Sequence, residues 1–513
     1  MSWQDLAQAA EQALGRPLTE HSLAPQQSLF NQGEPSSAVY LVLSGELEAH
    51  VQKRGAERSV PVGRIGAGEL VGEIGWALGT RRSASVVAAT PTSLVEVPAE
   101  VFPMLREAQH PSLGRVAALL DQRLRSSRLS TATQPVDDAL TGWLERRSSD
   151  RQDIDVVLLT HARSTQDLRL ALPWLGGLAD AELVELSRWL RPVFGEVLQA
   201  DPSSVGLLFL PRLTGDLMDP RRRAEVRRMV AQECMALARA NGAKVICLGG
   251  LTASLMKYGR LLDGAPEAQG VTVTSGHAVT AVCCVRTFLA GLQRAELEPE
   301  TEQLTIVGVG SVGAAFLELL LAKGRAPRRI LLTDLPRQRR RLEALITRLT
   351  PNLPKGVTLE AAPTTEGGRL PPGHPVYDSR MLFSATSAAD VIDIQQVLPG
   401  TVLVDDSQPH CWSRELGWER VQQRGDIFPC EAGLVDCSAL SYHSYFPFDY
   451  VEQLSAGTQH AWCCLTEGLL LAHDPSLRPT RGEPNLASVL SFDQSFEQAG
   501  LRPAPLRCGP HRL

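Results

Sequence analysis

Long apolar runs and an excess of basic residues are both missing from this chain of 513 residues. Its most apolar segments, such as AAFLELLLA, reach about half of the roughly 20 residues that a membrane-spanning helix needs. Lys and Arg number 51 against 57 Asp and Glu, which gives a formal net charge of −6. We therefore expect no transmembrane segment, and the charge gives no reason to expect a nucleic acid partner.

Disulfide and metal frameworks are also missing. None of the ten cysteines precedes Cys234, and none belongs to a CxxC pair. The first residues, MSWQDLAQAAEQALG, lack the basic and apolar regions of an export signal. We therefore expect a cytoplasmic protein with reduced thiols, each a candidate nucleophile. His and Cys residues near 410 and 460 have loose spacing, so we expect no metal site.

The hydrophobic pattern divides the chain into a β-rich first part and an α/β remainder. Residues 29–101 contain short alternating strands separated by glycines, which is typical of an antiparallel jelly roll. From residue 154 strands alternate with helices, one of them expected over 178–194, and this favours a Rossmann-type doubly wound parallel sheet. The expected parts are a jelly roll over 1–130, a hinge over 131–152, an α/β substrate domain over 153–300, a Rossmann domain over 301–440, and a C-terminal helical segment over 441–513 that packs back on the substrate domain.

One short stretch of the β-rich part, VGEIGWALGTRRSASVVA, places Glu73 nine residues before Arg82. Together with the preceding FNQGEPSSAVYLVLSGELEAHV, it resembles the phosphate-binding cassette of cyclic nucleotide-binding domains. The resemblance implies that Arg82 pairs with the cyclic phosphate and that Glu73 accepts a hydrogen bond from the ribose. The further ligand-binding candidates are Gly72, Ile74, Ser83 and Ser85.

The ligand implied by this resemblance is cyclic AMP or cyclic GMP, which the sequence does not distinguish. A jelly roll that has lost its ligand is the alternative, although Glu73 and Arg82 are both present. A strand follows the expected hinge where a gene regulator would have a helix-turn-helix, which argues against a transcription factor. Such domains often pair through the helix that is expected here over 114–129, so a homodimer is possible.

A second glycine pattern lies in LTIVGVGSVGAAFLELLL, between an expected strand and an expected helix. Its three glycines permit a tight turn, a close approach to a pyrophosphate and close helix packing. An acidic residue follows the next expected strand, which favours NADH, but the arginines just after it suit NADPH equally well. The residues expected to hold the dinucleotide are Gly308, Gly310, Ser311, Val312, Gly313, Asp334, Arg337, Arg339, Ser384 and Thr386.

Several segments in order, from about residue 153 to the end, resemble the cyanobacterial long-chain acyl-(acyl-carrier protein) reductases. The segments that carry the resemblance are DVVLLTHARSTQDL, ANGAKVICLGGLTAS, TVTSGHAVTAVCCVRTF, LTIVGVGSVGAAFL, TVLVDDSQP, CEAGLVDCSALS and HAWCCLTEGLLLA. The resemblance implies reduction of a fatty acyl thioester, bound to acyl-carrier protein or coenzyme A, to an aldehyde with NADPH. Two alternatives are a dehydrogenase of a small carbonyl or amino acid and a non-catalytic sensor of cyclic nucleotide and NAD(P).

The same resemblance implies a cysteine nucleophile, which we place at Cys437 in AGLVDC, with Cys411 and Cys430 as further candidates. A thiolate that attacks a thioester gives an acyl-enzyme that then accepts hydride. His443, six residues further on, is a possible base for this thiol. His277 in TSGHAVT stands near where the family has an Asn, and it is a candidate for polarising the thioester carbonyl.

Overall fold

The computed structural model describes residues 3–51, 60–77, 82, 84–107, 110, 116, 119, 153–171, 180–188, 190, 192–362, 368–444 and 458–513. The contacts divide the chain into two compact units. The first comprises Met1–Gln152, Ala162–Val197 and Leu208–Asp216, and the second Asp153–His161, Leu198–Leu207 and Leu217–Leu513. The expected hinge, and all but two residues of the expected helix over 114–129, lie outside the described residues. Within the described residues, no helix is long and apolar enough to cross a bilayer.

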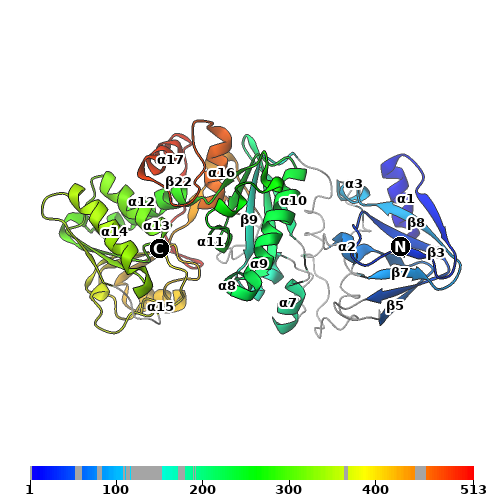
Figure 1. Ribbon diagram of the computed structural model, residues 1–513, viewed down its shortest axis with the longest axis horizontal. Helices are drawn as coiled ribbons and strands as arrows, with labels where there is room; N and C mark the ends of the chain where they lie inside the picture. Colours follow the sequence, from blue (N-terminus) through cyan, green and yellow to red (C-terminus); the bar gives the residue numbers. More distant parts are fainter. Residues whose placement is uncertain are drawn as a thin grey trace. The chain divides into compact units, whose positions relative to one another are not determined.

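The N-terminal part of the first unit is a β-sandwich of two four-stranded sheets, with strand orders β1-β8-β3-β6 and β2-β7-β4-β5 (Figure 1). Its strand pairs are antiparallel, as the short strands and glycine turns predict. The elements are α1 (Trp3–Leu14), β1 (Thr19–Leu23), β2 (Ser28–Phe30), β3 (Ala38–Ser44), β4 (Glu46–Val51), β5 (Val60–Gly66), β6 (Leu70–Val71), α2 (Glu73–Ala77), β7 (Ser85–Ala88), β8 (Thr92–Pro98) and α3 (Val101–Glu107). Inward-facing side chains such as Phe30, Leu47 and Leu94 form its core.

A five-stranded sheet of order β10-β11-β9-β12-β13 follows. Strand β12 pairs in parallel with both β9 and β13. The elements of this region are β9 (Val156–Ala162), α6 (Thr165–Ala171), α7 (Asp180–Ser187), β10 (Val193–Ala200), β11 (Ser203–Leu213), α8 (Thr214–Met218), α9 (Pro220–Met229), α10 (Met235–Ala240), β12 (Val245–Leu248), α11 (Leu251–Leu255) and β13 (Thr272–Thr274). The helix expected over 178–194 is wrong at its end: α7 ends at Ser187, Pro192 has no amide hydrogen to continue a helix, and β10 begins at Val193.

The third large sheet has six parallel strands in the order β16-β15-β14-β17-β18-β19. The chain starts in the middle, moves outward through β15 and β16, and returns to build β17, β18 and β19 on the other side. The direction of the winding therefore changes between β14 and β17. The elements are β14 (Gln303–Val307), α13 (Ser311–Ala322), β15 (Arg329–Thr333), α14 (Arg339–Leu349), β16 (Thr358–Ala361), β17 (Met381–Ser384), β18 (Thr401–Asp405), α15 (Arg414–Arg424) and β19 (Ile427–Glu431).

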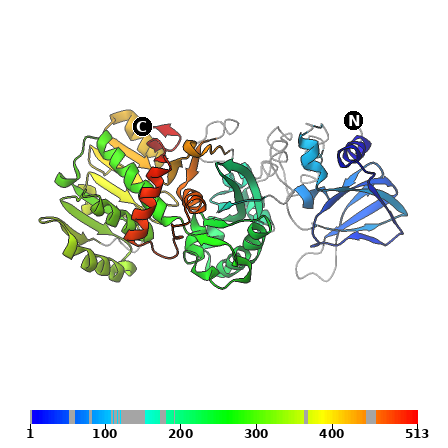
Figure 2. The same cartoon turned by 90° about the horizontal axis from the view of Figure 1, so that it is seen from above.

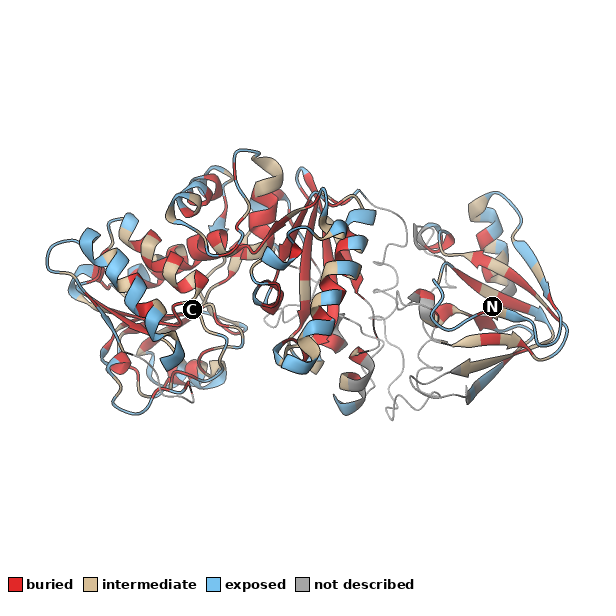
Figure 3. Cartoon of the chain, in the orientation of Figure 1, coloured by how far each residue is buried: buried red, intermediate tan, exposed pale blue. Residues whose placement is uncertain are grey.

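Both faces of this sheet are buried, so its strands are red along most of their length in Figure 3. Successive residues of one strand alternate between two apolar clusters. Ile330 and Leu332 of β15 belong to the cluster that includes α13, whereas Leu331 belongs to the cluster on the other face. Continuous apolar strands of this kind are expected where a parallel sheet is covered on both sides.

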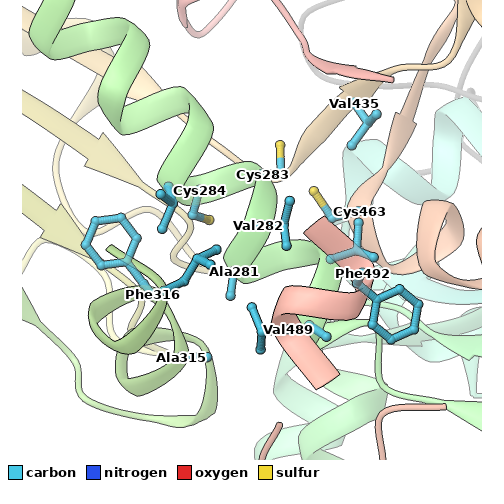
Figure 4. Close-up of a cluster of buried hydrophobic side chains, with 14 of the residues drawn as sticks. Ala281, Val282, Cys283, Cys284, Ala315, Phe316, Val435, Cys463, Val489 and Phe492 are labelled. Carbon is cyan, nitrogen blue, oxygen red and sulfur yellow. The ribbon is translucent and has the colours of Figure 1, made fainter. Parts of the chain in front are cut away.

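The buried helix α12 (His277–Arg294) is the centre of the second unit and contacts α13, α16 (Cys463–His473) and α17 (Leu486–Gln498). Figure 2 shows α17, in red, lying alongside the green helices, and Figure 4 shows Cys283, Cys284 and Phe316 in this core with Cys463 of α16. Helix α16 packs closely on the five-stranded sheet. A Cβ on its Gly468 would lie 2.2 Å from the sulfur of Cys247 in β12.

Three short strands, β20 (Leu434–Asp436), β21 (His460–Trp462) and β22 (Arg502–Pro503), form a small sheet, and β23 (Arg507–Cys508) pairs with β24 (His511–Arg512). The backbone amide of Cys463, the first residue of α16, donates to the carbonyl of Gly433, just before β20. This bond fixes the start of α16 next to the end of the six-stranded sheet, and that position matters for the site described below.

Candidate functional site

The cassette of the sandwich is built around Gly72 and Arg82. Gly72 has φ +89°, and a Cβ there would lie 2.3 Å from Nη1 of Arg82, so only glycine suits the position. Nη1 of Arg82 donates to the Gly72 carbonyl at 3.1 Å. The backbone of Arg82 is hydrogen-bonded to the opposite loop. Its amide donates to the Glu34 carbonyl, and its carbonyl accepts from the Gly33 amide. The arginine is therefore held by backbone on two sides.

The guanidinium of Arg82 is almost completely buried, with 4% of the residue exposed. Its central carbon lies 4.1 Å from the ring centre of Phe30 and 5.6 Å from that of Tyr40. Among the described residues, its Nε has no hydrogen-bond partner. Burial lowers the pKa of Arg82, although nearby acidic groups such as Glu73 oppose this shift. A buried cation with a spare donor is suited to bind an anion.

Glu73 is the first residue of α2 and is 1% exposed, with Ile74 half-buried beside it. Ser85 begins β7, and its hydroxyl oxygen accepts a hydrogen bond from the Gln32 amide at 2.9 Å. The structure thus gives Ser85 a part in holding the loop before β3. Ser83 lies outside the described residues.

The second glycine pattern forms a tight turn between β14 and α13. Gly308 has φ +88°, and a Cβ there would lie 2.4 Å from the carbonyl oxygen of Ala385. A Cβ on Gly313 would lie 2.2 Å from the carbonyl oxygen of Gly308, so that glycine lets the helix pack on the turn. A Cβ on Gly310, by contrast, would meet no atom within 4 Å among the described residues. The turn therefore has open space at Gly310, just before Ser311 and Val312 begin α13.

Asp334, at the end of β15, holds this turn in place. One carboxylate oxygen accepts from the Val309 amide at 2.8 Å and the other from the Leu335 amide at 2.7 Å. Arg337 and Arg339 are exposed just beyond it, and Nε of Arg339 donates to Glu343 at 2.8 Å. Of the two arginines, Arg339 is thus engaged within its own helix.

The loop after β17 contains Ser384 and Thr386. Ser384 is buried, and its hydroxyl donates to Asp405 at 2.7 Å, so its hydrogen is already used inside the protein. The Thr386 amide donates to the Ser407 hydroxyl at 2.9 Å. The Cβ of Thr386 lies 3.2 Å from where a Cβ on Gly308 would be, next to the glycine turn. Of the two, Thr386 is the residue at the turn.

His277 is brought against the glycine turn. Its Nδ1 lies 2.8 Å from the hydroxyl of Ser311, and its ring meets the Tyr258 ring edge-on at 5.1 Å between centroids. Burial lowers the pKa of His277 to about 4, so the imidazole is neutral at pH 7. A neutral ring has one nitrogen that donates and one that accepts.

The structure argues against the nucleophile expected at Cys437. This residue is 0% exposed, within the core, and its sulfur lies 3.7 Å from the Thr466 hydroxyl. Burial raises the pKa of the Cys437 thiol to about 12, and Asp436 acts in the same direction. His443 is exposed, which does not suit a base for a thiol inside the core. Cys411 and Cys430 are buried as well.

Cys464 is the residue that sequence reasoning missed. All ten cysteines are described, and Cys464 alone among them is not fully buried. It is the second residue of α16. The only signal in the sequence was its place in HAWCCLTEGLLLA, a stretch that carries the resemblance to the reductases.

Two glycines pack closely against Cys464. A Cβ on Gly249, just after β12, would lie 3.5 Å from its sulfur, and a Cβ on Gly276 would lie 2.3 Å from its Cα. Burial raises the pKa of the thiol to about 12, while hydrogen bonds from the amides of Leu465 and of Cys464 itself lower it. Gly276, which packs against the backbone of Cys464, is followed in the chain by His277. The imidazole of His277 contacts Ser311 at the glycine turn, so Cys464 lies near this turn.

The first comparison concerns the sandwich. Residues 20–109 match the family model of the cyclic nucleotide-binding domain. These residues are therefore a cyclic nucleotide-binding domain, and they contain Gly72, Glu73, Arg82 and Ser85.

Solved structures match about a quarter of the chain. The catabolite activator protein of Thermus thermophilus is 29% identical, over 24% of this chain and 56% of that one, with a TM-score of 0.21. A cAMP-binding acyltransferase from Mycobacterium smegmatis is 23% identical, over 24% of this chain and 37% of that one, with a TM-score of 0.21.

Curated relatives match parts of different length. Aminotransferase PigE of a Serratia species is 30% identical over 198 residues, which is 38% of this chain and 21% of that protein. Lysophospholipase nte1 of Aspergillus fumigatus is 36% identical over 100 residues, which is 19% of this chain and 6% of that protein. The chain thus spans a small fraction of the length of the relatives it matches.

Proposed function

We propose that the protein is an NAD(P)H-dependent reductase of fatty acyl thioesters, which forms an aldehyde through an acyl group on Cys464 and carries a cyclic nucleotide-binding domain. Two contacts carry this proposal. His277 contacts Ser311 at the glycine turn, and the preceding residue, Gly276, packs against the backbone of Cys464. The glycine turn and the partly exposed Cys464 are thereby linked through the adjacent residues Gly276 and His277. The acyl thioester as substrate rests on the resemblance of residues from 153 onward.

The residues of the turn suit a dinucleotide. The six-stranded order, which reverses between β14 and β17, is that of Rossmann folds, and such folds bind dinucleotides at this reversal. The open space at Gly310 would admit the pyrophosphate, with the amides at the start of α13 facing it. Asp334 would accept from the ribose, Arg337 would meet a 2′-phosphate, and Thr386 would lie by the nicotinamide end. When bound, NADPH supplies the hydride that reduces the acyl group.

Cys464 meets the needs of a nucleophile better than the other cysteines. It is partly exposed and lies in the first turn of a helix. Burial raises the pKa of its thiol to about 12, as it does for Cys437, and the amides of that turn act against this shift. The thiol attacks the thioester carbonyl, a new carbon–sulfur bond forms to Cys464, and the bond to the carrier sulfur breaks. The neutral His277 has one ring nitrogen on Ser311, and its other nitrogen is able to polarise the acyl carbonyl.

The cyclic nucleotide-binding domain suits a regulatory ligand, which we propose to be cyclic AMP or cyclic GMP. The Arg82 guanidinium would leave the Gly72 carbonyl and pair with the cyclic phosphate, while Glu73 accepts from the ribose. Binding that favours one state of the enzyme changes its rate, and couplings of about 5- to 150-fold are usual for such regulation.

The proposal is tested by mapping the acyl adduct. The protein is incubated with palmitoyl-coenzyme A without NADPH, digested with protease and analysed by mass spectrometry. We expect one palmitoyl group on Cys464, no adduct in Cys464→Ser, and an unchanged adduct in the matched variant Cys437→Ser.

An adduct on Cys437 that survives Cys464→Ser would overturn the assignment of the nucleophile. The absence of any adduct on the wild-type protein, combined with NADPH-dependent turnover of a small ketone, would instead identify a small-carbonyl dehydrogenase. The experiment therefore separates the thioester reductase from its main alternative.

A further inference from the structure

Helix α12 begins without a capping side chain of its own. The residue before it, Gly276, has φ +75° and no side chain that could accept from the amides of the first turn. A larger residue does not fit there, because a Cβ on Gly276 would lie 2.3 Å from Cα of Cys464. The close packing of Cys464 on this glycine therefore leaves the first amides of α12 in need of an acceptor from another element.

Glu467 of α16 supplies this acceptor. Its Oε2 accepts hydrogen bonds from the amides of Ala278 at 3.1 Å and Val279 at 3.2 Å, the second and third residues of α12. The carboxyl group also lies at the positive end of the α12 dipole, which favours a negative charge. The cap of α12 is thus a side chain that comes from a different helix.

The other carboxyl oxygen of Glu467, Oε1, binds two further segments. It accepts from the Thr274 hydroxyl at the end of β13 and from the Thr480 amide at 3.2 Å. Glu467 is completely buried. Burial raises its pKa, whereas the hydrogen bonds from Thr274, Thr480 and Val279 oppose the rise. Any movement of this carboxyl group would leave several buried donors without a partner, so its position is fixed.

These bonds connect the two groups of the proposed chemistry. Glu467 lies three residues after Cys464 on α16, and side chains at this spacing are neighbours on a helix surface. On α12, the amide of Ala278 directly follows His277, whose Nδ1 lies 2.8 Å from the Ser311 hydroxyl. One buried carboxyl group therefore joins the helix that carries the thiol to the helix start that carries the imidazole.

We propose that Glu467 is a positioning residue of this site, which caps α12 from α16 and thereby holds the His277 imidazole in place relative to the Cys464 thiol. This inference rests on the proposed function. Glu467 contacts neither the substrate nor the dinucleotide in this account, and it acts only through the position of His277.

The experiment is a double-mutant cycle on the full chain. It measures the rate of palmitoyl transfer from palmitoyl-coenzyme A to the protein without NADPH, by intact mass after rapid quenching. Glu467→Gln keeps the shape of the side chain but has one acceptor oxygen instead of two, so some of the donors lose their partner. We expect the maximal rate to fall about 10- to 100-fold, with a half-saturating concentration within about threefold of the wild type, because a misplaced catalytic group slows the reaction more than it weakens binding.

The second arm of the cycle tests whether this loss depends on His277. His277→Gln alone should also slow transfer. Adding Glu467→Gln to it should then lower the rate by no more than about threefold, because an imidazole that is absent cannot be misplaced. The matched control is Asn485→Ala, which removes the side-chain cap of α17, a hydrogen bond from the Ser488 amide at 2.9 Å. Since α17 carries neither His277 nor Cys464, this variant should keep the wild-type rate.

A folded Glu467→Gln that transfers palmitate at the wild-type rate would overturn the role of Glu467 and leave the proposed function intact. A full loss that recurs in the His277→Gln background would also overturn it, since Glu467 would then not act through His277. A wild-type protein that is never acylated would overturn both proposals.

Melting temperature is measured on each variant. If Glu467→Gln does not fold, Thr274→Val takes its place in the cycle, because it removes a single hydrogen bond to the carboxyl group. We expect a smaller loss of rate from Thr274→Val, again only when His277 is present, and a wild-type rate in this variant would contradict the proposal.

Discussion

At the residue scale, the sequence predicted the ligand-binding residues of the sandwich more readily than the catalytic residues of the second unit. The nine-residue spacing of Glu73 and Arg82 predicted a cassette, and the family model confirms a cyclic nucleotide-binding domain there. The state of Arg82 was not predictable, because its stacking on Phe30 and its bond to Gly72 depend on strands far apart in sequence.

Arg82→Ala is expected to weaken cyclic AMP binding about 10- to 100-fold, since hydrogen bonds to a charged group contribute about 1.5–3 kcal/mol. Isothermal titration calorimetry measures the affinity. Arg64→Ala serves as the control, because Arg64 is exposed and pairs with Glu46 at the surface. Wild-type affinity in Arg82→Ala, with the fold intact, would refute the role given to this arginine.

There is a physical reason why the sequence alone could not identify the nucleophile. Ten cysteines have the same chemistry in a sequence, and burial is what distinguishes them. Cys437 lies in the core, whereas Cys464 is partly exposed, and the two glycines that pack against Cys464, Gly249 and Gly276, are distant from it in the chain. Neighbouring residues gave no sign of this arrangement.

At the element scale, the periodic pattern located most strands and helices of the second unit. LTIV, RRILLTD, MLFS and TVLVD were expected as strands, and each is one. The parallel order of these strands follows from strand–helix alternation, and the structure confirms it. The pattern failed at 193–194, where strand β10 begins just after Pro192 instead of a continued helix.

The glycine turn gives a matched pair of substitutions. Gly310→Ala introduces a methyl group into open space, so we expect an unchanged melting temperature and a rise of about tenfold or more in the dissociation constant for NADPH. Gly313→Ala forces a Cβ to within 2.2 Å of the Gly308 carbonyl oxygen, so both stability and NADPH binding should fall.

Thermal unfolding and NADPH fluorescence titration measure the two effects on the same samples. If Gly310→Ala binds NADPH as well as the wild type does, the dinucleotide does not approach the turn at this residue. If Gly313→Ala is as stable as the wild type, helix α13 does not depend on close packing against the turn.

At the scale of the whole molecule, we propose that the chain joins two phosphate-binding sites of different design. A cyclic nucleotide-binding domain lies within the first unit, and a parallel sheet with a glycine turn lies within the second. We propose that the first site regulates and the second catalyses. The two curated relatives match 38% and 19% of the chain, so this combination must be tested on the full chain.

The most direct test of the central claim is aldehyde formation from palmitoyl-coenzyme A and NADPH by the full chain, with and without cyclic AMP. The account predicts one aldehyde per NADPH consumed, loss of this activity in Cys464→Ser, and a rate that cyclic AMP changes in the wild type but not in Arg82→Ala. NADPH that binds but is never consumed with any acyl thioester, whether or not cyclic AMP is present, would contradict the account.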